Sequence, residues 1–321
     1  MPKNNNQNSL RQQQGADETG KRFDPRYLAA KKSIDDCALN HHVLETLRQV
    51  LPQSTDNEPV KILELGAGIG TMLERLVDRG LLSGTLDYLA TDMDQSQLMA
   101  ARTYLLQWAE KHGHTLTWDG YGGRLSTARA DISLTLQHAG AEELAEKPES
   151  LGPFDLIIAH AVLDLVDLST VLPPLLSRLT TSGLAYFSLN FDGETVFLPE
   201  CAGEEEIIRR YHGSMEARLI GASHTGRRLL ALLQQPGLKI LAAGSSDWVI
   251  HPRGNKYSQD ETFFLHAIID TVENELAKKD RPLSHLANLT DWARLRHQQV
   301  EHGQLSLLAR HLDLLVQQDV S

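Results

Sequence analysis

The order of apolar and polar residues predicts alternating strands and helices over most of the chain. Short apolar runs bounded by Gly, Pro or polar residues predict strands at Val60–Leu65, Leu86–Thr91, Leu125–Ala130, Phe154–Ala159, Leu184–Asn190 and Leu238–Ala243. Amphipathic stretches predict four helices. The first runs from the glycines after Leu65 to Gly80, and the second follows an N-cap at Asp94 with Gln97 as its capping-box partner. The third is Val171–Leu179, with Pro173 and Pro174 in its first turn, and the fourth is Gly226–Gln235. This alternation indicates an α/β fold, a doubly wound and mostly parallel sheet of about seven strands with helices on both faces.

Both ends of the chain differ from this central part. Residues 1–22 are rich in Asn and Gln and lack an apolar run, which predicts a disordered tail. Residues 23–55 carry loosely helical spacing up to Pro52 and predict an N-terminal helical lid. We place the central domain at residues 56–255. A C-terminal helical extension is expected over residues 256–321, with helices at Glu261–Leu276 and Asp291–Val316.

Composition and net charge exclude several classes of partner for this protein. The 321 residues are 41% hydrophobic, enough for a sizeable core, and the net charge of -11 argues against nucleic acid as a partner. No segment approaches the roughly 18 apolar residues of a membrane span, and the only cysteines, Cys37 and Cys201, lie far apart. We therefore expect a cytoplasmic protein that acts on a small molecule, without a membrane or nucleic-acid partner and with no disulfide framework.

The turn from Glu64 to Gly70 is the strongest candidate for chemistry. Its sequence, Glu-Leu-Gly-Ala-Gly-Ile-Gly, joins a predicted strand to a predicted helix, and glycines there let the backbone pass close to a ligand. A dinucleotide fingerprint has the order G-x-G-x-x-G, whereas Thr71 occupies the place of its third glycine. Glu64 adds a carboxylate before the turn that can accept a hydrogen bond from a ligand ammonium group.

These residues resemble the first motif of the class I S-adenosylmethionine (SAM)-dependent methyltransferases, over roughly residues 59–250. In that family the acid at the end of the second strand binds the ribose hydroxyls, and Asp92 occupies the matching place, with Met93 as the apolar contact to adenine. The family's acid after the third strand binds the adenine amino group and matches Asp131 followed by Ile132. A solvated loop aspartate is the alternative for Asp131.

The fourth motif of the family matches residues 154–164, where Asp155 begins a buried strand. His160 stands at the carboxyl end of that strand and titrates near neutrality, so it is the candidate acid or base. A polar residue that only contacts the cofactor, or a structural histidine, is the alternative. The resemblance thus implies SAM as cofactor, with ten candidate ligands: Glu64, Gly66, Ala67, Gly68, Gly70, Asp92, Met93, Asp131, Ile132 and His160.

The candidate residues for binding the methyl acceptor are Tyr27 in the predicted N-terminal helical lid, Asn190 and Asp192 after the fifth strand, and His224. For each of them a plain structural role stays open. No metal is expected, because His160 stands where metal-using relatives have an aspartate and Phe191 separates the amide from the acid.

The sequence therefore predicts a SAM-dependent methyltransferase that acts on an O or N atom of a small molecule. A non-catalytic SAM-binding sensor or partner protein is the alternative. A nicotinamide-dependent oxidoreductase is disfavoured by the order of the glycines.

Overall fold

The computed structural model describes residues 24–54, 58–147, 151–219, 221–277 and 289–319, so the tail predicted over residues 1–22 lies outside the described residues. The helices of this part are α2 Pro25–Ala38, α3 His41–Val50, α4 Thr71–Asp78, α5 Gln95–Lys111, α6 Ala141–Glu146, the 3-10 turn η2 Leu163–Leu165, α7 Leu168–Leu176, α8 Glu204–Arg218, the 3-10 turn η3 Ala222–His224, α9 Thr225–Leu232, α10 Gln259–Ala277 and α11 Leu289–Glu301. The strands are β1 Val60–Leu65, β2 Gly84–Asp92, β3 Thr115–Asp119, β4 Gly122–Ser126, β5 Ala130–His138, β6 Phe154–His160, β7 Leu179–Leu198, β8 Leu238–Ser245, β9 Trp248–Ile250 and β10 Ser306–Gln318.

The strands form one sheet in the order β3-β4-β5-β2-β1-β6-β7-β10-β8, with β9 paired to β10. Strands β5, β2, β1, β6 and β7 are parallel to their neighbours in this run, and β10 is antiparallel between β7 and β8. The predicted doubly wound Rossmann-like α/β fold is confirmed. Over the described residues the sheet has ten strands instead of about seven, because the hairpin β3–β4 extends one edge and β9 adds a short strand to β10.

The order of the strands reverses between β1 and β6. From β1 the chain builds outward through β2 and β5, and then returns to the other side of β1 as β6. In open α/β sheets, ligands bind in the crevice at the carboxyl ends of the strands at such a switch point. The glycine turn after β1 and His160 at the end of β6 lie on its two sides.

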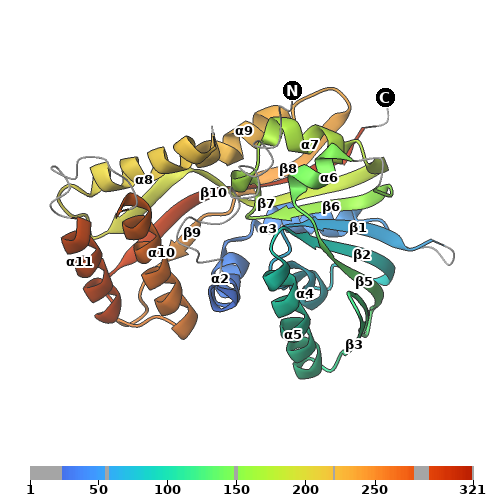
Figure 1. Ribbon diagram of the computed structural model, residues 1–321, viewed down its shortest axis with the longest axis horizontal. Helices are drawn as coiled ribbons and strands as arrows, with labels where there is room; N and C mark the ends of the chain where they lie inside the picture. The colour runs from blue at the N-terminus through green and yellow to red at the C-terminus, as the bar shows by residue number, and fades with distance from the viewer. Residues whose placement is uncertain (1–23, 55–57, 148–150, 220, 278–288, 320–321) are drawn as a thin grey trace, which may run out of the picture.

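Helices cover both faces of the sheet, and a second lobe lies beyond its edge (Figure 1). Helices α3, α4 and α5 pack on one face, and α6, α7 and α9 on the other. The long strands β7 and β10 run past the sheet into the second lobe, where α2, α8, α10 and α11 share a separate hydrophobic core. The switch point therefore lies between two packed bodies that α2 connects.

Three expectations about helices were wrong. The expected helix Asp291–Val316 is α11 followed by β10, whose Leu314, Leu315 and Val316 are all buried because this strand lies inside the sheet. Consecutive buried residues are typical of a strand that is covered on both faces. The expected C-terminal helical extension over residues 256–321 therefore ends in a sheet strand. Pro173 and Pro174 lie inside α7, which begins at Leu168, instead of in its first turn.

Candidate functional site

The glycine turn has a tight backbone geometry that depends on its glycines. Gly66, Gly68 and Gly70 all have positive φ, at +64°, +54° and +86°. A Cβ atom at Gly66 would lie 2.6 Å from Cγ2 of Val162, which follows β6 on the other side of the switch point. Only glycine fits at Gly66, because another residue would be strained in the backbone and would overlap Val162.

Asp92 is joined directly to this turn. Its Oδ2 accepts a hydrogen bond of 2.8 Å from the backbone N–H of Gly68, and its Oδ1 accepts one of 2.8 Å from that of Asp94. Burial raises the pKa of Asp92, although both N–H donors act to lower it. The structure thus brings together the two features that were 24 residues apart in the sequence. Beside them the side chain of Met93 is 54% exposed.

Glu64 is buried beneath the turn instead of facing solvent. The hydroxyl of Tyr88 donates a hydrogen bond of 2.7 Å to its Oε2. Burial raises the pKa of Glu64 to about 8, despite this hydrogen bond and the nearby charge of Arg75. Near pH 7 the side chain therefore holds a proton unless a cation comes close.

Asp131 and Ile132 do not lie at the carboxyl edge. Asp131 is the second residue of β5, and its partner in the register is Thr85 near the start of β2. At about 3.3 Å per residue this places Asp131 about 23 Å along the strand from His138, which ends β5. The expectation that Asp131 follows the third strand was wrong, because Leu125–Ala130 is not that strand. His138 lies beside Asp92 in the register, and its Nε2 is 2.9 Å from the carbonyl oxygen of Met93.

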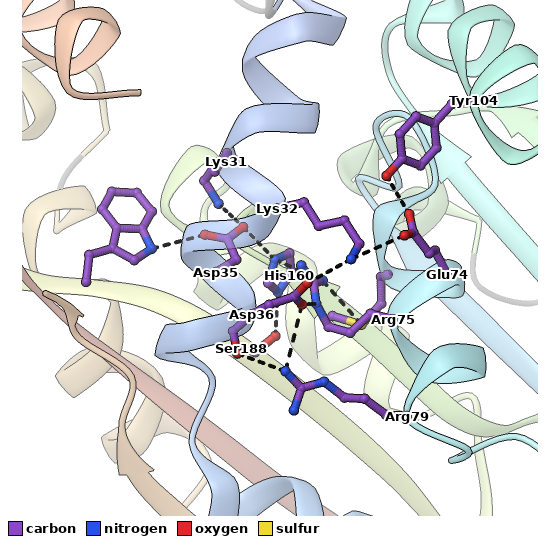
Figure 2. Close-up of polar contacts among 12 residues, drawn as sticks. Lys31, Lys32, Asp35, Asp36, Glu74, Arg75, Arg79, Tyr104, His160 and Ser188 are labelled. Carbon is purple, nitrogen blue, oxygen red and sulfur yellow. Dashed lines mark hydrogen bonds and ion pairs between the residues drawn. The ribbon is translucent and has the colours of Figure 1, made fainter. Parts of the chain in front are cut away.

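His160 ends β6 at the switch point, as expected, and both of its ring nitrogens are engaged (Figure 2). Nδ1 lies 2.8 Å from Oγ of Ser188 and Nε2 lies 3.1 Å from Oδ2 of Asp35. Burial, and after it the charge of Arg75, lower the pKa of His160 to about 4. Because the ionised Asp35 only accepts hydrogen bonds, Nε2 carries the proton and Nδ1 accepts from Ser188. This ring has no free nitrogen for an acceptor molecule.

Helix α2 supplies a buried charged cluster that the sequence analysis did not identify (Figure 2). Asp35 receives Nζ of Lys31 at 2.5 Å and Nε1 of Trp248 at 3.0 Å in addition to His160. Burial alone would raise the pKa of Asp35, but Lys31 and His160 hold it well below its usual range. The repeated spacing of Lys31–Asp35 and Lys32–Asp36 is a signal of paired charges on one helical face.

The neighbouring Asp36 ties α2 to α4. Its carboxylate accepts from Nε of Arg75, and Lys32 bridges Asp36 at 2.8 Å and Glu74 at 3.3 Å. Leu28, on the same helix, would lie 3.1 Å from a Cβ atom at Gly68. Helix α2 therefore lies against the glycine turn, and the lid role expected for residues 23–55 stays a prediction.

Asp164 is a further acidic group near the end of β6. It lies half-buried in η2, and burial raises its pKa to about 6. Its charge raises the pKa of Tyr27, on α2, and of Tyr211, on α8, although burial is the larger cause for both. Two residues at this level of the sheet, Ala161 and Leu189, have φ of +52° and +53° without being glycine. Such strained residues gather at functional sites.

The other candidate acceptor residues have structural contacts. Tyr27 stacks on Phe264 with ring centroids 5.7 Å apart. Asp192 is buried and binds Nε of Arg227 at 2.8 Å, and Nδ2 of Asn190 donates to the carbonyl oxygen of Leu312. Nδ1 of His224 lies 2.7 Å from the hydroxyl of Ser223, at 45% side-chain exposure. These contacts account for the polar groups of Asp192 without a ligand.

The described residues contain neither a candidate membrane span nor a candidate metal cluster. No helix in the ranges that the structure describes is long and apolar enough to cross a membrane. Over the same residues, no three His, Cys, Asp or Glu side chains gather as a metal site.

Comparison with known proteins found similarity only among solved structures. No family model and no curated protein matches the chain. A candidate type II methyltransferase from Anaeromyxobacter dehalogenans is 16% identical, with a TM-score of 0.45, over 86% of this chain and 95% of that one. A candidate sarcosine dimethylglycine methyltransferase from Galdieria sulphuraria is 16% identical, with a TM-score of 0.43, over 89% and 85%. A mycolic acid cyclopropane synthase solved with S-adenosylhomocysteine is 9% identical, with a TM-score of 0.41, over 85% and 83%.

These scores are too low to carry an argument about activity. The fold rests on the chain's own strand order, with the glycine turn and Asp92 at the switch point between β1 and β6. The chain has the doubly wound α/β fold that its resemblance to the class I SAM-dependent methyltransferases implied.

Proposed function

We propose that this protein is a SAM-dependent methyltransferase that acts on an O or N atom of a small molecule. The observation that carries the proposal is the hydrogen bond between Asp92 and the backbone of Gly68 at the switch point. It fixes a carboxylate beside a glycine cradle, the arrangement that a ligand with vicinal ribose hydroxyls requires.

The residues of the carboxyl edge fit the parts of SAM. The glycine turn presents backbone without side chains at Gly66 and Gly68, which suits the close approach of the methionine chain, and the buried Glu64 lies before the turn for its ammonium group. Asp92 has oxygen lone pairs left for the ribose hydroxyls, and the exposed side chain of Met93 offers an apolar surface to adenine. Ala67 and Gly70 complete the turn. Asp131 and Ile132 have no part in this assignment, since they lie near the amino end of β5, at the opposite ends of the strands from the glycine turn.

When bound, SAM supplies an electrophilic methyl group, so the chain has to orient the acceptor, exclude water and take up a proton. His160 does not suit the last task, because Ser188 and Asp35 occupy its ring nitrogens. Asp164 suits it better, since a carboxylate with a pKa of about 6 is mostly ionised at pH 7 and is basic enough to accept a proton. A base beside the site supports an acceptor that loses a proton on methylation, which is an O–H or N–H group.

The test is transfer of a labelled methyl group. The protein is incubated with methyl-labelled SAM and the small-molecule fraction of a cell extract, and the products are separated by mass. Label is expected in a low-mass product, at a lower rate with Asp164→Asn at pH 7. Binding of SAM without transfer to any compound would identify a sensor instead of an enzyme, and absence of SAM binding would reject both.

A further inference from the structure

Arg75 is a buried cation whose hydrogen bonds the fold leaves incomplete. It lies on α4, which begins directly after the glycine turn, and it is 1% exposed. Of its five N–H donors, the one on Nε meets a carboxylate, that of Asp36. Nη1 lies 3.9 Å from the thioether of Met72, a weak acceptor, and Nη2 has no hydrogen-bond partner within the part of the chain that the structure describes.

His160 does not complete the set. Its Nε2 lies 3.4 Å from Nη1 of Arg75, but Nε2 carries the proton that is donated to Asp35. Two donors facing each other make no hydrogen bond. The contact shows instead where the guanidinium lies: between α4, which follows β1, and the carboxyl end of β6. These are the two sides of the switch point.

The missing acceptor makes the buried position of Arg75 costly. A guanidinium that is kept away from water needs an acceptor for each of its donors, and Nη2 has none among the described residues. The cost of this unsatisfied donor falls when a ligand anion binds beside it.

We propose that Arg75 binds the carboxylate of the methionine part of the methyl donor. This inference rests on the proposed function. A guanidinium fork matches a carboxylate in shape and charge, and the donor carries one carboxylate, on the chain that the glycine turn holds. Helix α2, held to Arg75 through Asp36, closes over the same group. Arg75 thus links the bound donor to the closed lid.

The test compares two ligands that differ only in that carboxylate. S-adenosylhomocysteine and its decarboxylated analogue share adenine, ribose, thioether and amine, and their affinities are measured by calorimetry. The wild-type protein is expected to bind the analogue roughly 10- to 100-fold more weakly, as for loss of a charge-assisted pair. In Arg75→Gln the two affinities are expected to agree within about threefold. Arg75→Lys, which keeps the charge but not the fork, is expected to give an intermediate ratio.

Arg79→Gln is the matched control. Arg79 is the C-cap residue of α4, one turn after Arg75, and its side chain is 33% exposed. It donates a hydrogen bond to the carbonyl oxygen of Asp36. Its removal is therefore expected to leave the ratio of the two ligand affinities unchanged. Equal binding of both ligands by the wild-type protein would overturn the proposal even if Arg75→Gln failed to fold. A full ratio in folded Arg75→Gln would also overturn it, and both results would leave the donor site intact. Binding of neither ligand would reject the proposed function itself.

Discussion

Glu64 is expected to release a proton when the methyl donor binds. Its pKa of about 8 in the free protein comes from burial, so about 0.9 of the molecules carry the proton at pH 7. The ammonium group of the donor, placed beside Glu64, favours the ionised carboxylate. Binding at pH 7 should therefore release close to one proton from this side chain.

The sign of the pH dependence follows from the raised pKa. Below pH 8 the carboxyl group must lose a proton before it can pair with the cation, so affinity should rise with pH, by about tenfold per unit between about pH 5 and 8. Above pH 8 the carboxyl group is already ionised while the ammonium group of the donor begins to lose its proton, so the affinity should stop rising.

Calorimetry in two buffers with different ionisation enthalpies measures the released proton directly. About 0.9 proton is expected at pH 7. Glu64→Gln is the matched control, because it keeps a hydrogen-bond acceptor for Tyr88 and cannot ionise. If the wild-type protein released less than about 0.2 proton at pH 7, the assignment of the ammonium group to Glu64 would be refuted.

Three further variants test other parts of the account. Asp164→Asn should remove the rise of kcat/KM through about pH 6, because the ionised carboxylate is the proton acceptor, and an unchanged pH profile would exclude that role. Gly66→Ala should lower the free energy of unfolding by about 1–3 kcal/mol and weaken donor binding, since its Cβ would lie 2.6 Å from Val162; urea unfolding showing no loss would contradict the geometry. Asp192→Asn should lower the free energy of unfolding only slightly, because the pair that it weakens has the exposed Arg227 as its cation, while donor affinity stays the same; a selective loss of affinity would restore a ligand role.

Sequence patterns predicted the central part of the fold because its signals are local. Val60–Leu65 was predicted with the bounds that β1 has, and Asp94 caps α5 as expected, its side chain accepting from the N–H of Ser96. The third parallel strand was missed, although residues 130–138 alternate between buried and exposed positions. The hairpin β3–β4 directly before it drew the prediction to Leu125–Ala130, and this shift moved the adenine contact to Asp131.

Sequence patterns did not predict the buried charged cluster around Asp35, His160 and Arg75, for a different reason. Asp35 and His160 are 125 residues apart, and their contact depends on how α2 packs over the sheet. The position of His160 at the end of its strand was predicted correctly, but the low pKa comes from burial and from Arg75, which only the folded chain provides. The incomplete hydrogen bonding of Arg75 is visible only once its neighbours are placed.

Calorimetry with SAM tests the central claim most directly, with Asp92→Ala and Asp131→Ala as a matched pair from the two edges of the sheet. The account predicts that the wild-type protein binds SAM, that Asp92→Ala weakens binding by roughly tenfold or more, and that Asp131→Ala binds as the wild type does. No detectable binding to the wild-type protein, or equal affinity in Asp92→Ala, would contradict it.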